Sequence, residues 1–183
     1  MTKILLIGSG YAHLSILRRL LNEKSKDYEV TFISSSKDDV PIDFESLIEK
    51  ASFSFIEDTI ISFDPLQKML LSFSGEIYRF DVISFDFDMK FSLFKQALVP
   101  VAEDGTMLVE DTLQNKEFPF LFGAGDCVSI GGLPSGSKFN DKQGDVLWNN
   151  IKRYISGQKL HTLNNKSMSD PLNKWLTRIF KRF

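Results

Sequence analysis

The first third of the chain alternates short apolar runs with polar turns in an order that predicts a βαβ unit. Four consecutive aliphatic residues, 4–7, are typical of a strand buried on both faces of a parallel sheet. Gly8 and Gly10 follow directly, and leucines then recur at helical spacing over residues 14–21. A second apolar run, residues 29–33, completes a strand–helix–strand unit of about the usual length.

The middle of the chain predicts further strands joined by tight turns. Residues 44–51 have the spacing of a short helix, and residues 53–56 favour a strand. Three strand-like runs separated by turn dipeptides then predict a small antiparallel β-meander, at residues 59–63, 68–72 and 76–80. Residues 81–87 return to the pattern of a buried strand, and residues 89–96 form a connector without a clear period.

The C-terminal half contains fewer elements. A short strand is expected at residues 106–109, and residues 119–127 predict a buried strand that enters a glycine turn. Residues 131–136 are expected to be loop, and residues 141–156 a helix with Gly157 at its C-terminal cap. The whole pattern predicts an α/β protein with a Rossmann-like, parallel sheet and a small antiparallel meander.

Composition narrows the class of protein. The chain of 183 residues has 43% hydrophobic and 25% charged residues and a formal net charge of −2, which gives no support to nucleic-acid binding. Its 17 phenylalanines predict a densely packed aromatic interior. Cys127 is the only cysteine, which excludes an internal disulfide and a C-x-x-C redox pair and is typical of a reducing cytoplasm.

The first glycine turn carries the candidate chemistry. Gly8 can make the tight turn, and Gly10 has no side chain to keep a pyrophosphate away from the N-terminus of the following helix. His13 stands where the third glycine of G-x-G-x-x-G is expected, and Ser34 stands where a ribose-binding acid usually follows the second strand. An ordinary strand–turn–helix without a ligand is the alternative for this stretch.

A second motif resembles a known flavin signature. Residues 104–114 and 118–127, which end in Gly123-Ala124-Gly125-Asp126-Cys127, are similar to the C-terminal flavin motif of the FAD-dependent pyridine-nucleotide oxidoreductases. The branch it most resembles comprises type II NADH dehydrogenases, sulfide:quinone oxidoreductases and the flavin domains attached to selenide,water dikinases. In the last group the first motif is also G-x-G-x-x-H, and a serine also replaces the ribose acid.

The resemblance implies FAD as the cofactor, held by residues 1–160. The residues it assigns to cofactor binding are Gly8, Ser9, Gly10, Tyr11, Ala12, His13, Ser34, Ser35, Gly125, Asp126 and Gln143. Relatives carry an NAD(P)H domain between the two motifs, but here residues 88–105 are too few for a second βαβ unit, which needs about 30. We therefore expect a flavin domain that lacks the NAD(P)H domain and receives electrons from outside.

Three candidate residues keep simpler alternatives. Asp126 is expected near the ribityl chain or the phosphates, although an aspartate after a buried strand can also be a plain turn residue. Cys127 is more consistent with a small buried residue than with a nucleophile, and His13 with a phosphate contact or a helix cap than with a general base. No catalytic residue is assigned, and no metal-ligand cluster is recognisable.

The last segment predicts a linker, from residue 161, and a basic amphipathic helix at residues 171–183. Such a helix is typical of a membrane-surface segment, and the alternative is a helix packed on its own domain or on a second copy. We expect a cytoplasmic protein, peripheral at the inner face of the membrane if the helix binds lipid. The partners expected are a redox protein or a second copy of the chain, and not nucleic acid.

Two function classes follow. The first is an FAD-binding, oxidoreductase-like domain that exchanges electrons with an external donor and acceptor. The second is a non-catalytic nucleotide-binding or partner-binding scaffold of the same fold. A scaffold that binds no dinucleotide is also open, because of His13 and Ser34.

Overall fold

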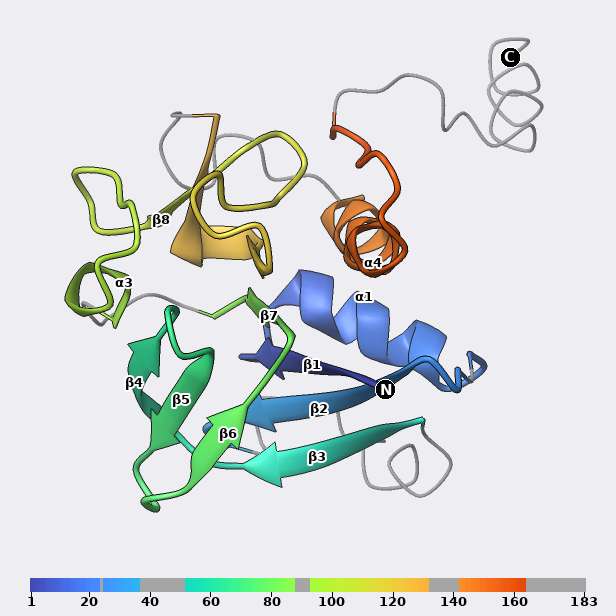
Figure 1. Ribbon diagram of the computed structural model, residues 1–183, viewed down its shortest axis with the longest axis horizontal. Helices are drawn as coiled ribbons and strands as arrows, with labels where there is room; N and C mark the ends of the chain where they lie inside the picture. Colours follow the sequence, from blue (N-terminus) through green and yellow to red (C-terminus); the bar gives the residue numbers. More distant parts are fainter. Residues whose placement is uncertain (24, 37–51, 88–92, 132–141, 164–183) are drawn as a thin grey trace, which may run out of the picture.

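A computed structural model describes residues 1–23, 25–36, 52–87, 93–131 and 142–163. Its centre is a five-stranded, all-parallel sheet with the strand order β3-β2-β1-β7-β9 (Figure 1). The strands are β1 (Thr2–Ile7), β2 (Tyr28–Ser34), β3 (Phe53–Glu57), β7 (Val82–Phe85) and β9 (Leu121–Gly123). The predicted α/β, Rossmann-like fold is confirmed.

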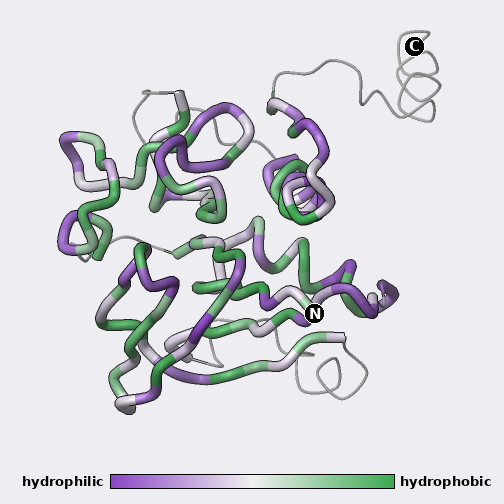
Figure 2. The backbone as a smooth tube through the Cα atoms, in the orientation of Figure 1, coloured by the Kyte–Doolittle hydropathy of each residue, from purple (hydrophilic) through white to green (hydrophobic). Residues whose placement is uncertain are grey.

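The central strands are apolar because both faces of the sheet are covered. Residues 4–7 of β1 and all four residues of β7 are buried, as a parallel sheet in an α/β protein requires. Figure 2 shows the hydrophobic stretches along the strands and hydrophilic stretches in many of the loops that join elements. In register, Ile7 lies between Ile33 and Phe85, and Phe85 lies opposite Gly123. The strands therefore end at one common edge.

Two helices lie on one face of the sheet. The first, α1 (Tyr11–Leu20), packs on the strands, and α4 (Gln143–Ile155) packs on α1 (Figure 1). Gly144 allows the close approach of the two helices, because a Cβ atom there would lie 2.7 Å from the Cβ atom of Ser15. Both helices fall where the sequence predicts them.

The C-terminal end of α4 has the predicted glycine cap. Gly157 adopts a left-handed φ of +64° after the capping residue Ser156. The Gly157 N–H donates to Tyr154 O at 3.1 Å and the Gln158 N–H donates to Arg153 O at 2.8 Å, which is the Schellman pattern.

The three short strands after β3 form the predicted antiparallel meander. They are β4 (Ile60–Asp64), β5 (Met69–Ser72) and β6 (Ile77–Arg79), in the order β4-β5-β6. An aromatic contact joins the meander to the sheet, since the ring centroids of Phe63 and Phe85 are 5.4 Å apart. Phe85 also contacts Phe94, which follows β7 in the chain, with ring centroids 5.1 Å apart. The aromatic interior predicted from the phenylalanine content is confirmed.

Two short elements were not predicted. A four-residue helix, α3 (Leu93–Gln96), lies in the expected connector, and β10 (Val128–Ile130) pairs in parallel with β8 (Met107–Val109) after the 3-10 turn η2 (Gly125–Cys127). Both elements are too short for their sequences to show a helical or a strand periodicity. The burial of β10 includes Ser129, whose hydroxyl group bonds to that of Thr106 at 2.7 Å.

Some predictions concern residues outside the described part of the chain. They are the helix at 44–51, the loop from 132 to 136, the linker from 164 and the amphipathic helix at 171–183. Within the described residues, no helix is long and apolar enough to cross a bilayer.

Candidate functional site at the carboxyl edge of the sheet

The common edge at which the parallel strands end gathers the polar residues of the candidate site. Gly8 follows β1, Ser34 ends β2 and Ser35 follows it, Asp86 follows β7, and Gly125 lies two residues beyond β9. In open α/β sheets, ligands bind in the crevice outside the carboxyl ends of the strands. The register of the sheet therefore brings both sequence motifs to one place.

The turn between β1 and α1 depends on glycine. Gly8 has a φ of +95°, its N–H donates to Ile33 O at 2.9 Å, and a Cβ atom there would lie 2.5 Å from Asp86 O. The N–H of Gly10 donates to the same Asp86 carbonyl at 2.8 Å. Backbone hydrogen bonds thus hold this turn against the ends of both neighbouring strands.

The Asp86 side chain occupies the N-terminus of α1. Asp86 as a whole is 2% exposed, and its carboxylate accepts the His13 N–H at 3.0 Å. A Cβ atom on Gly10 would lie 2.0 Å from Asp86 Oδ1, and one on Gly125 would lie 2.2 Å from it. Gly10, which was expected to let a pyrophosphate approach the helix, and Gly125 of the second motif therefore both face this carboxylate.

This arrangement is a helix cap supplied from another strand. Gly10 is the N-cap residue of α1 and has no side chain to accept the first N–H groups. Asp86 accepts the N–H of the third helical residue, His13, as a capping side chain does, and its charge suits the positive end of the helix. A ligand phosphate would compete for the same donor.

His13 connects α1 to the glycine turn and to β7. Its fully buried ring has Nδ1 2.8 Å from Gly8 O and Nε2 2.9 Å from Ser84 Oγ. Since a carbonyl only accepts, Nδ1 carries the proton and Nε2 accepts from the Ser84 hydroxyl group. The ring therefore holds the turn and β7 together, and the backbone N–H, not the ring, contacts the capping carboxylate.

Burial moves the pKa values of this pair in opposite directions. Burial lowers the pKa of His13, against the charge of Asp86 and the hydrogen bond to Gly8. Burial likewise raises the pKa of Asp86, against the charge of His13 and hydrogen bonds from the His13 and Ala12 backbone, and the nearby Asp126 raises it further. Both groups are thus shifted toward their neutral forms.

Cys127 lies next to this pair and is completely buried. Its thiol donates to Ala124 O at 3.2 Å and to Phe85 O at 3.4 Å, and burial raises its pKa. A buried thiol with a raised pKa is a poor nucleophile. The interpretation of Cys127 as a small buried residue is confirmed.

A cavity of about 150 Å³ lies beside the glycine turn. Its lining comprises Ile7, Gly8, Ile33, Ser34, Ser35, Asp58, Thr59, Ile60, Phe87 and Leu93. It is smaller than the roughly 300 Å³ or more of a typical ligand pocket. Its hydroxyl and carboxylate groups suit the ribose and base of a nucleoside, whose polar groups are hydrogen-bond donors and acceptors.

Asp58 supplies a carboxylate beside the serine that ends β2. Its N–H donates to Ser34 O at 2.9 Å, and its side chain accepts from the Ser74 hydroxyl group and from Tyr78 OH at 3.2 Å. Hydrogen bonds from the hydroxyl groups of Ser74 and Ser72 hold the pKa of Asp58 below its usual range. An acid is therefore present at this edge, directly after β3 and not after β2.

The remaining predicted residues are distributed around the edge. Gln143, at the start of α4, is buried, and its Oε1 accepts the Gly125 N–H at 3.1 Å. Ala12 is buried, Ser9 is half-buried, and Tyr11 and Asp126 are exposed. The structure therefore joins the glycine motif to the Gly125–Gln143 pair, with Asp126 at the surface.

Sequence analysis missed Asp86, Ser84 and Asp58 as site residues. Asp58 closely follows the predicted strand 53–56, and the carboxyl ends of parallel strands meet at one edge, so that signal was available in the sequence. Asp86 follows β7 in the structure but lay inside the predicted strand 81–87, so its place at the edge was not apparent. Across the part of the chain that the structure describes, no three His, Cys, Asp or Glu side chains form a group that could hold a metal ion.

Comparison with known proteins rests on structure. No protein-family model and no curated protein sequence matches the chain. NADH:rubredoxin oxidoreductase from Clostridium acetobutylicum is similar over 88% of this chain and 76% of its own, with 15% identity and a TM-score of 0.59.

Two further solved structures match less of their own length. Sulfide:quinone oxidoreductase from Aquifex aeolicus matches over 49% of this chain and 25% of its own, with 19% identity and a TM-score of 0.38. Putidaredoxin reductase, in its covalent complex with putidaredoxin, matches over 87% and 42%, with 14% identity and a TM-score of 0.40. The chain thus spans a quarter to less than half of these two proteins. The first comparison confirms the predicted resemblance at the level of fold: this chain has the fold of the FAD-dependent pyridine-nucleotide oxidoreductases.

Proposed function

We propose that this chain binds FAD at the carboxyl edge of its five-stranded sheet. The observation that carries the proposal is the convergence of two distant motifs, residues 8–13 and the Gly125–Gln143 pair, beside a cavity lined by Ser34 and Ser35. The shared fold with FAD-dependent oxidoreductases supports it. The adenosine half of the cofactor would lie in the cavity.

The residues fit the two halves of such a ligand unequally. The cavity offers hydroxyl groups and the Asp58 carboxylate, which suit a nucleoside. The N-terminus of α1, where the pyrophosphate would bind, carries the Asp86 carboxylate in this structure. A pyrophosphate does not fit there unless the Asp86 side chain turns away.

The electron partners belong to the same proposal. Bound FAD would supply one- and two-electron redox chemistry. The sequence between β7 and β8 is too short for a second nucleotide domain, so we propose that electrons come from a redox protein or a small donor.

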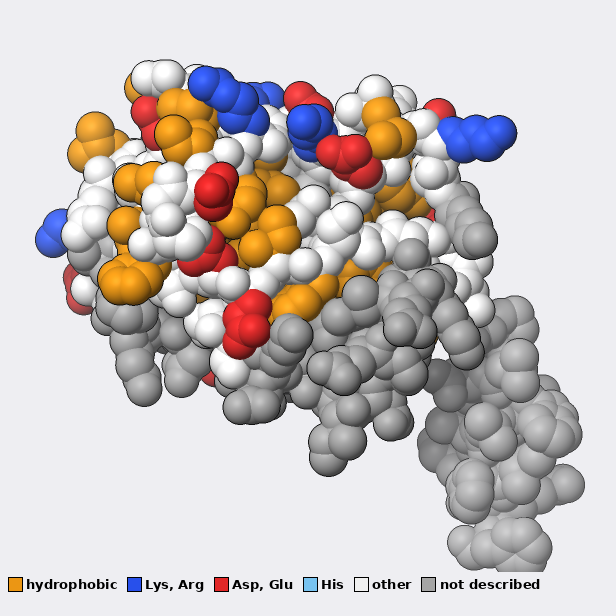
Figure 3. All heavy atoms as spheres, turned by 90° about the horizontal axis from the view of Figure 1, so that it is seen from below, with side chains coloured by type: hydrophobic (Ala, Val, Ile, Leu, Met, Phe, Trp, Pro, Cys, Tyr) orange, Lys and Arg blue, Asp and Glu red, His pale blue; other side chains and the backbone are white. Residues whose placement is uncertain are grey.

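A non-catalytic role is the second candidate, and two observations favour it. Asp86 fills the phosphate position with the chain's own carboxylate. On the meander, the cross-strand pair Leu71 and Ile77 is 37% and 60% exposed, and Phe73 is 81% exposed. Figure 3 shows apolar side chains gathered among acidic ones on the face seen from below. A scaffold that binds a nucleoside or a protein partner would also have these features.

A flavin-binding assay separates the two candidates. We expect purified protein to have a flavin absorption spectrum, or to quench FAD fluorescence on titration. The Asp126→Ala substitution should weaken FAD binding several-fold, because the carboxylate can accept hydrogen bonds from the ligand. Asp81→Ala is the matched control, since Asp81 lies at the opposite end of β7, where it accepts the Lys3 N–H at 2.7 Å.

The outcomes are distinct. Equal effects of the two substitutions would remove the role assigned to Asp126. Failure to bind FAD at any concentration tested would overturn the flavoprotein proposal and leave the non-catalytic candidate, which binding of adenosine alone would support.

A further inference from the structure

We infer that Asp86 sets the charge preference of this site: its carboxylate competes with the phosphates of a ligand for the N-terminus of α1. A neutral nucleoside can then enter beside it, and a pyrophosphate binds only when the Asp86 side chain is displaced, which loss of its charge makes easier. The inference rests on the proposed nucleotide site and concerns which form of nucleotide that site accepts.

The N-terminus of α1 has room for one anionic group, either the Asp86 carboxylate or a phosphate. Asp86 accepts the His13 N–H at 3.0 Å, which is a donor that a phosphate on this helix would use. Gly10 and Gly125 close the space around the carboxylate, since a single added carbon atom on either would lie within 2.2 Å of Asp86 Oδ1. A phosphate oxygen is no smaller than that carbon. A phosphate can therefore enter only when the Asp86 side chain turns away, and the positive end of the helix holds that side chain more strongly when it is ionised than when it is neutral.

The groups around Asp86 favour its neutral form. His13 faces it from α1, with a pKa lowered by burial, so that the imidazole contributes little positive charge near neutral pH. Asp126 and Cys127 face it from the turn after β9, and the charge of Asp126 opposes a second negative charge. Acidification should therefore remove the competing charge from Asp86 while the bridging phosphates of FAD stay ionised.

The cavity beside the turn does not depend on this carboxylate. Its polar lining comes from Ser34, Ser35, Asp58 and Thr59, and Asp86 is not among the lining residues. A nucleoside without phosphate should thus bind equally well whether or not residue 86 is charged. This difference between ligands distinguishes competition for the helix from a general loss of structure.

The test measures FAD and adenosine affinity by calorimetry for wild type, Asp86→Asn and Asp81→Asn at pH 8 and pH 6. Asn keeps an oxygen that accepts the His13 N–H and removes the charge. Asp81 is the matched control, an exposed aspartate at the amino end of the same strand. Circular dichroism checks that each variant is folded.

We expect Asp86→Asn to bind FAD about tenfold more tightly than wild type at pH 8, because the positive end of α1 holds a neutral amide less strongly than a carboxylate and a phosphate can displace it more easily. Adenosine affinity should change less than about twofold, and Asp81→Asn should match wild type for both ligands. Wild type alone should bind FAD more tightly at pH 6 than at pH 8. This last arm needs no variant and holds even if Asp86→Asn folds poorly.

The outcomes separate this inference from the proposed function. Binding of FAD by Asp86→Asn but not by wild type supports the inference and overturns the flavoprotein proposal for the natural chain. Tight FAD binding by wild type at both pH values, unchanged in Asp86→Asn, overturns the inference and keeps the flavoprotein proposal. Absence of FAD binding in both proteins overturns both.

Discussion

Two carboxylates lie at opposite ends of α1 and behave in opposite ways. Asp86 caps the N-terminus, where the helix dipole favours a negative charge, yet its pKa is raised, chiefly by burial. Glu23 lies three residues beyond the C-terminus, where the dipole disfavours a negative charge, yet its pKa is lowered. Position along the helix therefore does not decide which carboxylate keeps its charge.

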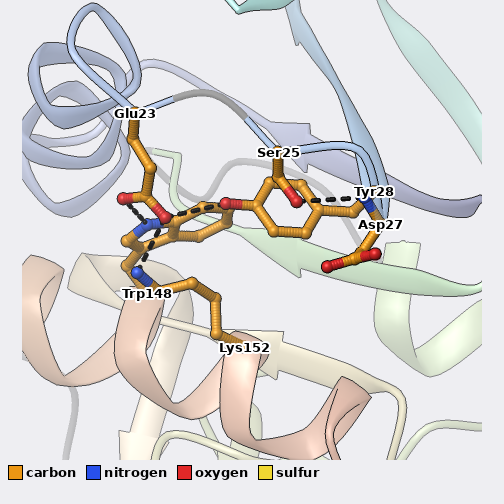
Figure 4. A network of polar contacts seen from close by, with 6 residues as sticks. All are labelled: Glu23, Ser25, Asp27, Tyr28, Trp148 and Lys152. Atoms are coloured by element: carbon orange, nitrogen blue, oxygen red, sulfur yellow. Dashed lines mark hydrogen bonds and ion pairs between the residues drawn. The ribbon is translucent and has the colours of Figure 1, made fainter.

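The donors around each group explain the difference. Glu23 accepts from Tyr28 OH at 2.7 Å, from Lys152 Nζ at 2.8 Å and from Trp148 Nε1 at 3.1 Å, as Figure 4 shows. Burial raises the pKa of Glu23, but these donors, one of them a cation, outweigh it. Asp86 has backbone donors and a histidine that burial keeps neutral. The pKa of a carboxyl group is lowered where charged and polar side chains donate to it, and Glu23 has three such donors.

The two carboxylates also have different roles in the structure. Glu23 joins the end of α1 to β2 and α4, where Tyr28 and Trp148 pack edge to face with ring centroids 5.5 Å apart. Asp86 lies at the ligand edge, with the glycines of both motifs closed around it. The Glu23 carboxylate, with three side-chain donors, joins structural elements, whereas the Asp86 carboxyl group, whose pKa burial raises, can respond to pH and to a ligand.

The largest expected effect on stability comes from a substitution beside Asp86. Gly10→Ala should destabilise the protein by about 3 kcal/mol, because the new methyl group would lie 2.0 Å from Asp86 Oδ1 in a packed site. Urea unfolding followed by circular dichroism measures the loss. The backbone of Gly10, with a φ of −61°, tolerates alanine, so the cost reports the carboxylate alone.

An Asp86→Ala background is the control for this prediction. Asp86→Ala itself should destabilise the protein by about 1–3 kcal/mol, because it leaves the His13 N–H without its acceptor. Added to that variant, Gly10→Ala should destabilise the protein by less than about 1 kcal/mol, because the carboxylate is gone. Equal costs of Gly10→Ala in both backgrounds would show that Asp86 does not fill the space beside Gly10.

These two residues also mark how far sequence reasoning reaches. Residues 4–7 and 29–33, the meander turns and Gly157 all carry local patterns, and the elements they predict are present. The glycines of the first motif were correctly placed at a tight turn. What they make room for is set by β7, more than 70 residues away in the chain, so Asp86 was described as part of a strand and its contact was missed.

The same limit applies to His13 and to the ribose acid. The ring of His13 bonds Ser84 because β1 and β7 are neighbours, a pairing that no local pattern specifies. Asp58 comes beside Ser34 because β3 pairs with β2. Sequence alone thus predicts which segments reach the edge, and the sheet order decides which side chains meet there.

A pH profile sharpens the comparison with an intermediate effect. The folded-state pKa of His13 lies below its unfolded value of about 6.5, so below that pH the unfolded chain binds more protons and stability falls as the pH drops. We expect a loss of at most about 2 kcal/mol between pH 7 and pH 5 from this group, which is the limit set by its unfolded pKa. Asp86 acts in the opposite direction, since its raised pKa stabilises the fold at low pH.

The measurement uses an Asp86→Asn background, so that the histidine titrates alone. In that background, His13→Gln should flatten the dependence of the free energy of unfolding on pH between pH 7 and pH 5. Urea unfolding at each pH measures this free energy. His161→Gln is the matched control, because the chain has only these two histidines and His161 lies outside this site. A profile that His161→Gln flattens and His13→Gln does not would contradict the assignment.

The smallest expected effect concerns Glu23. Glu23→Gln should destabilise the protein by about 0.5–1 kcal/mol, because the ion pair with Lys152 is partly exposed, with side chains 32% and 33% exposed, and glutamine still accepts from Trp148 and Tyr28. The loss should shrink in 1 M salt, where charges are screened over about 3 Å. A double-mutant cycle with Lys152→Gln measures the pair itself. A coupling as large as the Gly10→Ala penalty would mean that the exposed carboxylate, and not the buried one, dominates the stability of α1, and the contrast between the two ends of the helix would be reversed.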